Sequence, residues 1–205
     1  MNNAKLMFFH SVMGGGKTTL MLQKVYNDIQ ANKPGSIIVM KLSVDTRNDH
    51  IRSRAMPQNP LKAGLMVCST TNIFALVQSL AVQPVAIYVD EANFLTRDQV
   101  FQLNKIVTIL QISVHCFGLS TNFKREFFEG SRCLFEIADE VIECHSAINC
   151  SCGKSARFNA RKVNGSFIFE GNSIAVEQGD ITYVVLCKHC YEQEEEIYIN
   201  STQLT

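Results

Sequence analysis

The sequence lacks a long apolar run and has no excess of charge of either sign. Nineteen basic and nineteen acidic residues give the 205-residue chain a formal net charge of zero. This balance argues against a large nucleic-acid or membrane footprint. No apolar run approaches the length of a membrane span, the N-terminus has no signal-peptide layout, and no internal repeat is present. We therefore expect a soluble, cytoplasmic protein with no membrane partner and no stable nucleic-acid partner.

The eight cysteines are distributed in a way that disfavours a disulfide scaffold. Cys68, Cys116 and Cys133 are scattered through apolar surroundings, as is usual for small buried thiols. The last third of the chain carries two tight pairs, Cys150 with Cys152 and Cys187 with Cys190. Paired spacing of this kind in a cytosolic protein favours a metal over disulfides.

A glycine-rich stretch follows a short apolar run and precedes a segment with helical spacing. This order of strand, glycine-rich turn and helix is the context that a phosphate-binding P-loop requires. Glycines let backbone N–H groups converge on phosphate oxygens, and the following helix adds its N-terminal dipole. Lys17 would reach the β- and γ-phosphates, and the Thr18 hydroxyl would face Mg²⁺. The alternative is a surface turn, but we predict a nucleoside triphosphate site at Ser11, Val12, Met13, Gly14, Gly15, Gly16, Lys17 and Thr18.

A second functional segment is predicted where a continuous apolar run, 85–89, ends in two carboxylates. Such a run fits a strand that is buried on both faces of a parallel sheet. Asp90 and Glu91 would then emerge at the edge where open α/β sheets bind ligands. Asp90 is the candidate for holding Mg²⁺ through water. Side chains alternate along a strand, so Glu91 is available for another role.

The order of the remaining segments predicts the fold class. Strand-like and helix-like patterns alternate between residues 4 and 142, with Thr96 as a helix cap. We therefore expect an α/β P-loop NTPase (RecA-like) domain at 1–142, with a right-handed, mainly parallel sheet. Residues 41–64 are polar and are predicted to form a long loop, either functional or merely solvated.

The region 143–205 is predicted to be a small zinc-ribbon-like domain. Helical periodicity stops, short β-like runs occur at 166–169 and 181–186, and the acidic tail 192–196 is expected to be solvated. Structural Zn²⁺ takes four thiolate or imidazole ligands, which predicts a site at Cys150, Cys152, Cys187 and Cys190. Cys144, His145 and His189 are spare donors, any of which could replace one of these ligands. Buried thiols without metal are the alternative.

Taken together, these motifs resemble the zinc-containing thymidine kinases of the cellular and bacterial type (type II). The resemblance spans about residues 4–191 of the chain. It is carried by the stretches 11–18, 89–95, 118–123 and 128–131, and by Tyr183 with the last cysteine pair.

The resemblance implies an activity and a role for each matching residue. The activity is transfer of the ATP γ-phosphate to the 5′-hydroxyl of thymidine or deoxyuridine, giving dTMP in pyrimidine deoxynucleotide salvage. Glu91 matches the catalytic base, and Asp90 and Asn93 join the ATP and Mg²⁺ positions. The implied nucleoside site comprises Met13, Leu119, Phe123, Phe128 and Tyr183. The resemblance further implies a structural Zn²⁺, a homotetramer and feedback inhibition by dTTP.

Some residues depart from the family pattern, and two other functions stay open. Ser11 stands where many members have glycine, Asn93 replaces a glutamine, and Asn122 replaces an aspartate. One alternative is a P-loop ATPase whose zinc module binds nucleic acid through a basic group: Lys154, Arg157, Arg161 and Lys162. The other is a nucleotide-binding regulatory protein without turnover.

Overall fold

The computed structural model describes residues 4–31, 37–43, 50–53, 56–144, 148–172 and 180–203. The chain divides into two compact units. The first, here called the sheet unit, comprises Met1–Ser11, Gly16–Leu119 and Phe128–Cys144. The second, the cysteine unit, comprises Val12–Gly15, Ser120–Phe127 and His145–Thr205. The cysteine unit therefore recruits two short segments from the first two thirds of the chain.

The sheet unit contains a six-stranded sheet in the order β5-β2-β6-β7-β1-β8. Every described strand pair in it is parallel. This confirms the expected α/β class with a mainly parallel sheet. The strands are β1 (Leu6–Ser11), β2 (Ile37–Leu42), β5 (Leu65–Val67), β6 (Ala86–Asp90), β7 (Ser113–Leu119) and β8 (Glu140–Glu143).

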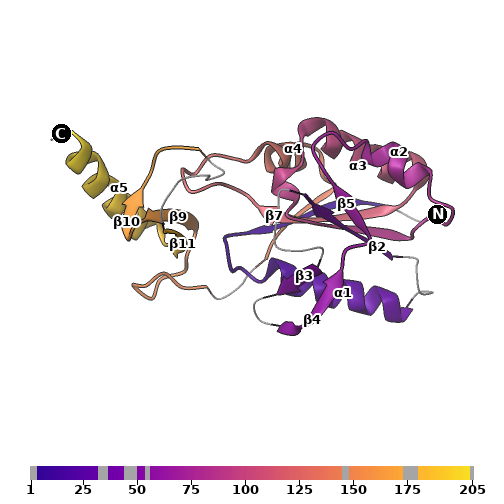
Figure 1. Ribbon diagram of the computed structural model, residues 1–205, viewed down its shortest axis with the longest axis horizontal. Helices are drawn as coiled ribbons and strands as arrows, with labels where there is room; N and C mark the ends of the chain where they lie inside the picture. The colour runs from indigo at the N-terminus through magenta and orange to yellow at the C-terminus, as the bar shows by residue number, and fades with distance from the viewer. Residues whose placement is uncertain are drawn as a thin grey trace. The chain divides into compact units, whose positions relative to one another are not determined.

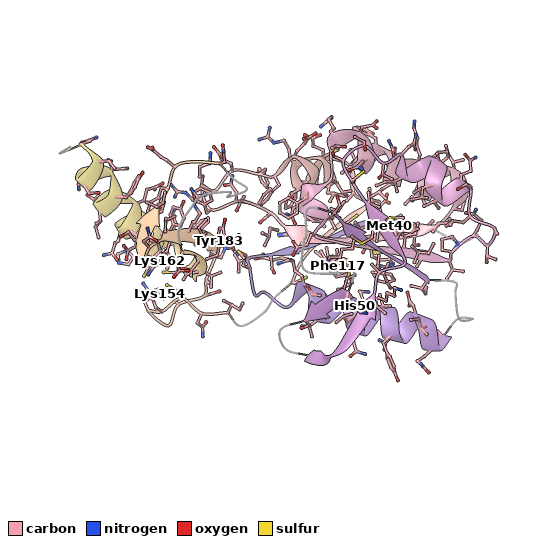
Figure 2. The ribbon with its side chains drawn as sticks, in the orientation of Figure 1. Met40, His50, Phe117, Lys154, Lys162 and Tyr183 are labelled. Atoms are coloured by element: carbon pink, nitrogen blue, oxygen red, sulfur yellow. The ribbon has the colours of Figure 1, made fainter. Side chains whose placement is uncertain are left out.

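Helices cover both faces of this sheet (Figure 1). Alternation along β6 shows why: Val89 joins the core under α2 (Ile73–Gln78) and α3 (Arg97–Leu110), whereas Tyr88 joins the core under α1 (Lys17–Ala31). Met40 and Phe117, labelled in Figure 2, belong to these two opposite cores. The helical elements are α1 (Lys17–Ala31), α2 (Ile73–Gln78), the short 3₁₀ helix η1 (Ala92–Phe94), α3 (Arg97–Leu110) and α4 (Glu129–Ile137). Thr96 caps α3 with a capping box, as the sequence predicts.

The prediction of a long loop over 41–64 is wrong. Within that stretch, β3 (His50–Ser53) and β4 (Met56–Lys62) pair as an antiparallel hairpin. Ile51 is buried in the core that also contains Met21 of α1, which gives this polar segment its apolar anchor. Residues 44–49 and 54–55, including the charged residues singled out in the sequence, lie outside the described part of the chain.

The cysteine unit contains a three-stranded antiparallel sheet followed by a helix. The elements are β9 (Phe158–Val163), β10 (Ser166–Ile168), β11 (Ile181–Leu186) and α5 (Lys188–Thr202), with strand order β10-β9-β11. Residues 192–196, expected to be a solvated acidic tail, lie within α5, and three of them, Glu192, Gln193 and Glu196, are exposed as expected. The sequence did not predict that this stretch is helical. Tyr191 in the first turn of α5 is fully buried and packs against Phe158 and Phe169. This aromatic contact anchors an otherwise polar helix.

Candidate functional site

The glycine-rich stretch connects the end of β1 to the start of α1. Gly14 and Gly16 have φ angles of +73° and +74°, a left-handed conformation that glycine adopts without strain. Ser11, in contrast, is the last residue of β1 and is buried, so its position does not require glycine. The Nζ atom of Lys17 lies 3.5 Å from both the carbonyl oxygen and the Oγ atom of Ser11. The serine at this position is thus compatible with a P-loop geometry.

The two predicted carboxylates lie at the carboxyl end of β6. Asp90 is its final residue and is buried, with 6% of its surface exposed. Glu91 follows with φ +52° and ψ +39°, a left-handed conformation that is uncommon for a residue with a side chain. Such conformations cluster at functional sites, where the surrounding structure holds them in place. The backbone thus turns sharply between the two carboxylates.

Lys41 is a neighbour of Asp90 that sequence reasoning missed. It is fully buried on β2, and the β2–β6 register makes it the partner of Asp90. Partners in adjacent parallel strands present their side chains to the same face of the sheet. A lysine is almost never fully buried without a compensating interaction. A charged residue inside an apolar strand would have been the signal in the sequence.

Asn93 connects the end of β6 with the end of β7 inside the sheet unit. Its Oδ1 atom accepts a hydrogen bond from the Leu119 N–H at 3.0 Å. No described residue accepts a hydrogen bond from its Nδ2 atom, although the side chain is only 2% exposed. Gly118 allows this approach, because a Cβ atom there would lie 2.9 Å from Oδ1 of Asn93. Asn93 therefore carries a buried amide donor without a described acceptor, directly after the end of β6.

The five predicted nucleoside residues are divided between the two units. Leu119 and Phe128 belong to the sheet unit, whereas Met13, Phe123 and Tyr183 belong to the cysteine unit. The Phe128 ring contacts Phe94 edge to face, with ring centroids 5.5 Å apart. Phe123 is buried, whereas Tyr183 on β11 is exposed.

Ser120–Phe127, here called the aromatic loop, is a tight turn organised by Asn122. Oδ1 of Asn122 accepts hydrogen bonds from the N–H groups of Lys124 and Glu126, at 2.8 and 3.0 Å. Its Nδ2 atom donates to the Glu126 carboxylate at 3.1 Å, and this bond, with a smaller contribution from Lys124, lowers the pKa of Glu126. An aspartate would make the first two bonds but would repel Glu126. Asparagine in place of aspartate therefore suits the glutamate of this chain.

Three further residues that sequence reasoning missed hold the aromatic loop within the cysteine unit. The Tyr191 hydroxyl donates to the Phe123 carbonyl at 2.6 Å, and Asn159 and Arg161 of β9 contact the loop from a second side. In the sequence, Asn159 and Arg161 are marked only as polar residues two positions apart, and Tyr191 only by following Cys190. Arg161 is fully buried, so it contributes nothing to the surface basic group on which the nucleic-acid alternative rests.

The four paired cysteines form one cluster. Their sulfur atoms all lie within 4.8 Å of one another, and those of Cys152 and Cys187 are 3.6 Å apart. Four thiolates around one ion, with Zn–S bonds of about 2.3 Å, would be about 3.8 Å apart. The cluster could therefore hold a metal ion. Among the described residues, neither Cys144 nor His189 joins it, and His145 lies outside them.

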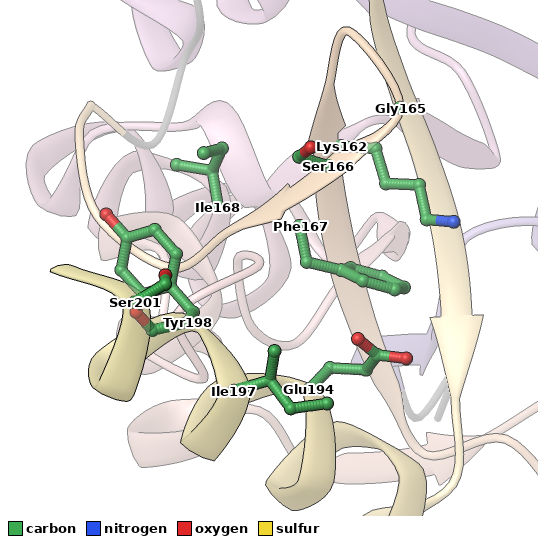
Figure 3. A pocket seen from close by; sticks show the side chains of 9 residues that line it. All are labelled: Lys162, Gly165, Ser166, Phe167, Ile168, Glu194, Ile197, Tyr198 and Ser201. Atoms are coloured by element: carbon green, nitrogen blue, oxygen red, sulfur yellow. Dashed lines mark hydrogen bonds between the residues drawn. The ribbon is translucent and has the colours of Figure 1, made fainter. Parts of the chain in front are cut away.

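A cavity of about 540 Å³ lies elsewhere in the cysteine unit, between the β9–β10 hairpin and α5 (Figure 3). Phe167 and Lys162 line it on the hairpin side, and Glu194 and Ile197 line it on the helix side. None of the predicted site residues lines this cavity. It is therefore separate from the candidate site.

Comparisons with known proteins identify the family of the chain. None of the helices in the described ranges has the length and apolar character needed to cross a membrane. The thymidine kinase of Legionella pneumophila (strain Lens) is 35% identical to the chain, over 94% of the chain and 91% of its own length. The thymidine kinase of Pasteurella multocida is 34% identical, over 93% of the chain and 98% of its own length. The thymidine kinase of Enterococcus faecalis is 31% identical, over 92% of the chain and 95% of its own length. The family model for thymidine kinase matches residues 4–191, the range over which the sequence shows its resemblance. The chain belongs to the thymidine kinase family.

Proposed function

We propose that the protein is an ATP-dependent thymidine kinase. It transfers the γ-phosphate of ATP to the 5′-hydroxyl of thymidine or deoxyuridine, an alcohol acceptor, and supplies dTMP for pyrimidine deoxynucleotide salvage. The observation that carries this proposal is the pair of carboxylates at the end of β6, within a chain that matches the thymidine kinase model over residues 4–191. Phosphoryl transfer to a small hydroxyl needs alignment and charge neutralisation more than covalent chemistry.

On the ATP side, we assign the triphosphate to the residues from Ser11 to Thr18. Lys17 begins α1, so its charge and the N–H groups of the first helical turn converge on anionic oxygens. Asp90, acting through water, and the Thr18 hydroxyl would hold the Mg²⁺ that accompanies ATP. Mg²⁺, when bound with ATP, neutralises charge on the β- and γ-phosphates. The Nδ2 donor of Asn93 is assigned to the same anionic region.

Glu91 is assigned as the general base. Its left-handed backbone separates its direction from that of Asp90, so one carboxylate serves the metal and the other serves the 5′-hydroxyl. The base accepts the hydroxyl proton as the oxygen attacks phosphorus.

On the nucleoside side, we assign Met13, Leu119, Phe123, Phe128 and Tyr183 to the thymine base and sugar. Aromatic and apolar side chains suit an uncharged nucleoside better than a phosphorylated one. We assign the cysteine cluster to one structural Zn²⁺, because four thiolates leave no open position for a reacting water. The functional division of the chain is then 1–142 for the nucleotide-binding kinase domain and 143–205 for the zinc domain with its nucleoside-closing loop.

The wider setting of the enzyme follows from the same assignment. dTTP combines the thymine base with a triphosphate, the two groups to which site residues are assigned, and is proposed as a feedback inhibitor. The resemblance supports a homotetramer in the cytoplasm, and light scattering of the purified protein tests the tetramer directly.

A nucleoside-dependent ATP consumption assay tests the proposed function. We expect ADP to form in the presence of thymidine or deoxyuridine, together with the nucleoside monophosphate. Single-stranded and double-stranded DNA are included in parallel. ADP release that depends on DNA, or that needs no acceptor, would contradict the kinase assignment.

A further inference from the structure

Asn159 joins the P-loop segment to the aromatic loop inside the cysteine unit. It lies on β9 and has only 3% of its surface exposed. Its Oδ1 atom accepts a hydrogen bond from the Met13 N–H at 2.8 Å. Its Nδ2 atom donates to the Thr121 carbonyl oxygen at 3.0 Å. One buried side chain thus binds backbone groups from the two segments that the cysteine unit takes from the earlier part of the chain.

The partners dictate the orientation and the chemistry of this amide. A backbone N–H only donates and a carbonyl only accepts, so Oδ1 must face Met13 and Nδ2 must face Thr121. An ionised carboxylate could satisfy Met13 but would repel the carbonyl, and an aliphatic side chain would satisfy neither group. Because Asn159 is itself buried and both of its polar atoms are paired, its replacement leaves two partly buried backbone groups without these partners, so the amide is strongly specified here.

Both backbone groups lie next to residues assigned to the nucleoside. Met13 itself belongs to that set. Thr121 lies two residues before Phe123, in a loop whose turn is closed by hydrogen bonds between Asn122 and Glu126. Met13 also lies in the stretch assigned to the triphosphate, but its N–H donates to Asn159 and is therefore not available to a phosphate oxygen. Lys17 and Thr18, which are assigned to the triphosphate, lie instead in α1. This helix packs in the core of the sheet unit through its buried residues Met21 and Val25.

We propose that Asn159 is a positioning residue for the nucleoside: it holds the Met13 and Thr121 backbones in one register and thereby sets the affinity for thymidine rather than for ATP. The proposal rests on the proposed function, because it takes the assignment of Met13 and Phe123 to the nucleoside as its starting point. Asn159 acts through these segments and has no part in the phosphoryl transfer itself.

Two variants at this position separate positioning from simple stability. Asn159→Leu is close in volume and removes both hydrogen bonds. Asn159→Asp keeps the acceptor for Met13 and, when ionised, loses the donor to Thr121. When protonated, the same carboxyl can donate to Thr121 while its other oxygen accepts from Met13. The control is Lys162→Gln, on the opposite face of β9 beside the cavity (Figures 2 and 3).

The experiment measures dissociation constants for thymidine and for a non-hydrolysable ATP analogue, together with KM, kcat and thermal unfolding, for each full-length variant. We expect Asn159→Leu to weaken thymidine binding by about 10-fold or more, the scale of losing two hydrogen bonds. Binding of the ATP analogue should change by less than about threefold, within ordinary context effects on α1. Lys162→Gln should match the wild type in both.

The carboxyl group introduced by Asn159→Asp gives a readout that a merely structural role would not move. Burial and the adjacent carbonyl favour its protonated form. Relative to the wild type at each pH, thymidine affinity of Asn159→Asp should recover as the pH falls from about 8 to about 5.5, across the range of a raised carboxyl pKa. Asn159→Leu should show no such recovery.

Two results would overturn the proposal. One is thymidine affinity within about twofold of wild type in a folded Asn159→Leu variant, a difference that context effects alone can produce. The other is an equal loss of thymidine and ATP affinity in both variants, with no recovery on acidification. If instead the wild-type protein binds no thymidine and consumes no ATP in its presence, the proposed function fails.

Discussion

The guanidinium carbon of Arg161 lies 3.8 Å from the centroid of the Phe123 ring. Both residues are almost completely buried. Nη1 and Nη2 of the same guanidinium donate to the carbonyl oxygens of Asn172 and Glu170, at 2.9 and 2.5 Å. One planar cation thus stacks on the aromatic loop and ties it to the chain that follows β10. Phe123 is thus held at two points: its ring stacks on Arg161 of β9, and its backbone carbonyl accepts a hydrogen bond from the Tyr191 hydroxyl of α5.

Replacing this arginine with lysine should destabilise the protein despite keeping the charge. An ammonium group lacks the planar fork and the stacking face, so at least one carbonyl loses its donor. We expect Arg161→Lys to lower the free energy of unfolding by about 1–3 kcal/mol and to weaken thymidine binding. Urea denaturation and thymidine titration measure the two effects. Arg157→Lys, at an exposed position, is the matched control. If both variants have the same free energy of unfolding and the same thymidine affinity, the stacking of Arg161 on Phe123 contributes to neither.

Glu91 combines a proposed catalytic role with a left-handed backbone, and substitutions can separate the two. Glu91→Gln keeps shape and should lower kcat by about 10²–10⁴-fold, the usual contribution of a positioned base. Glu91→Ala and Glu91→Gly should also lose activity. Glycine adopts the left-handed conformation freely, so the Gly variant should be more stable than the Ala variant by about 1 kcal/mol, opposite to the order in a helix.

Steady-state kinetics and thermal unfolding of the three variants check this prediction. Near-wild-type kcat in Glu91→Gln would remove Glu91 from the mechanism. An Ala variant as stable as the Gly variant would show that the left-handed backbone is not a source of strain.

Much of the sheet unit could be predicted because its signals are local. The buried run 85–89, the glycine-rich turn and the Thr96 cap each specify structure over a few residues, and the parallel order follows from their alternation. The hairpin β3–β4 was missed because its stretch of sequence is largely polar and carries two prolines; among its described side chains, Ile51 and Leu61 reach a core. Helix α5 was missed because its acidic residues face solvent, and a single buried aromatic, Tyr191, anchors its first turn.

The arrangement around the candidate site was less predictable because it depends on contacts between distant segments. Cysteine spacing alone predicts a metal-binding cluster, because each close pair already places two ligands side by side and the fold has only to bring the two pairs together. The bonds from Asn159 to Met13 and Thr121 carry no such spacing rule. Their only trace in the sequence is a polar residue at an inward position of β9, which reads as an ordinary surface residue until the sheet is known.

His115 predicts how the stability of the sheet unit depends on pH. Its ring stacks on Tyr88 with centroids 4.6 Å apart, and burial, together with Lys24, lowers its pKa to about 4; Asp28 and Glu140 act weakly in the opposite direction. Between about pH 6.5 and pH 4, the unfolded chain therefore binds a proton that the folded protein does not. The contribution of His115 to the free energy of unfolding is therefore fully present above about pH 6.5. As the pH falls toward 4, this contribution decreases by on the order of 3 kcal/mol.

A His115→Phe variant keeps an aromatic ring in the stack but has no proton to bind. We expect its free energy of unfolding to fall less steeply than that of the wild type over this pH range. Chemical denaturation at several pH values gives both slopes. Parallel slopes would mean that His115 titrates in the folded protein much as it does in the unfolded chain.

Removing the proposed zinc should affect the nucleoside more than ATP. The Sγ atom of Cys187 caps α5 and Cys190 lies in its first turn, directly before Tyr191, whose hydroxyl holds the Phe123 carbonyl. A double variant, Cys187→Ser with Cys190→Ser, should lose bound zinc, loosen the start of α5 and release this hydrogen bond.

The metal contributes to folding because its ligands converge only in the folded chain. Thymidine affinity and thermal stability should therefore fall, whereas ATP binding through Lys17 and α1 should persist while the sheet unit stays folded. Elemental analysis and separate titrations of ATP and thymidine measure these effects, with Cys68→Ser, a cysteine that is not part of the cluster, as the control. A metal-free wild-type protein that binds thymidine normally would remove both the zinc assignment and this link from the cluster to the nucleoside.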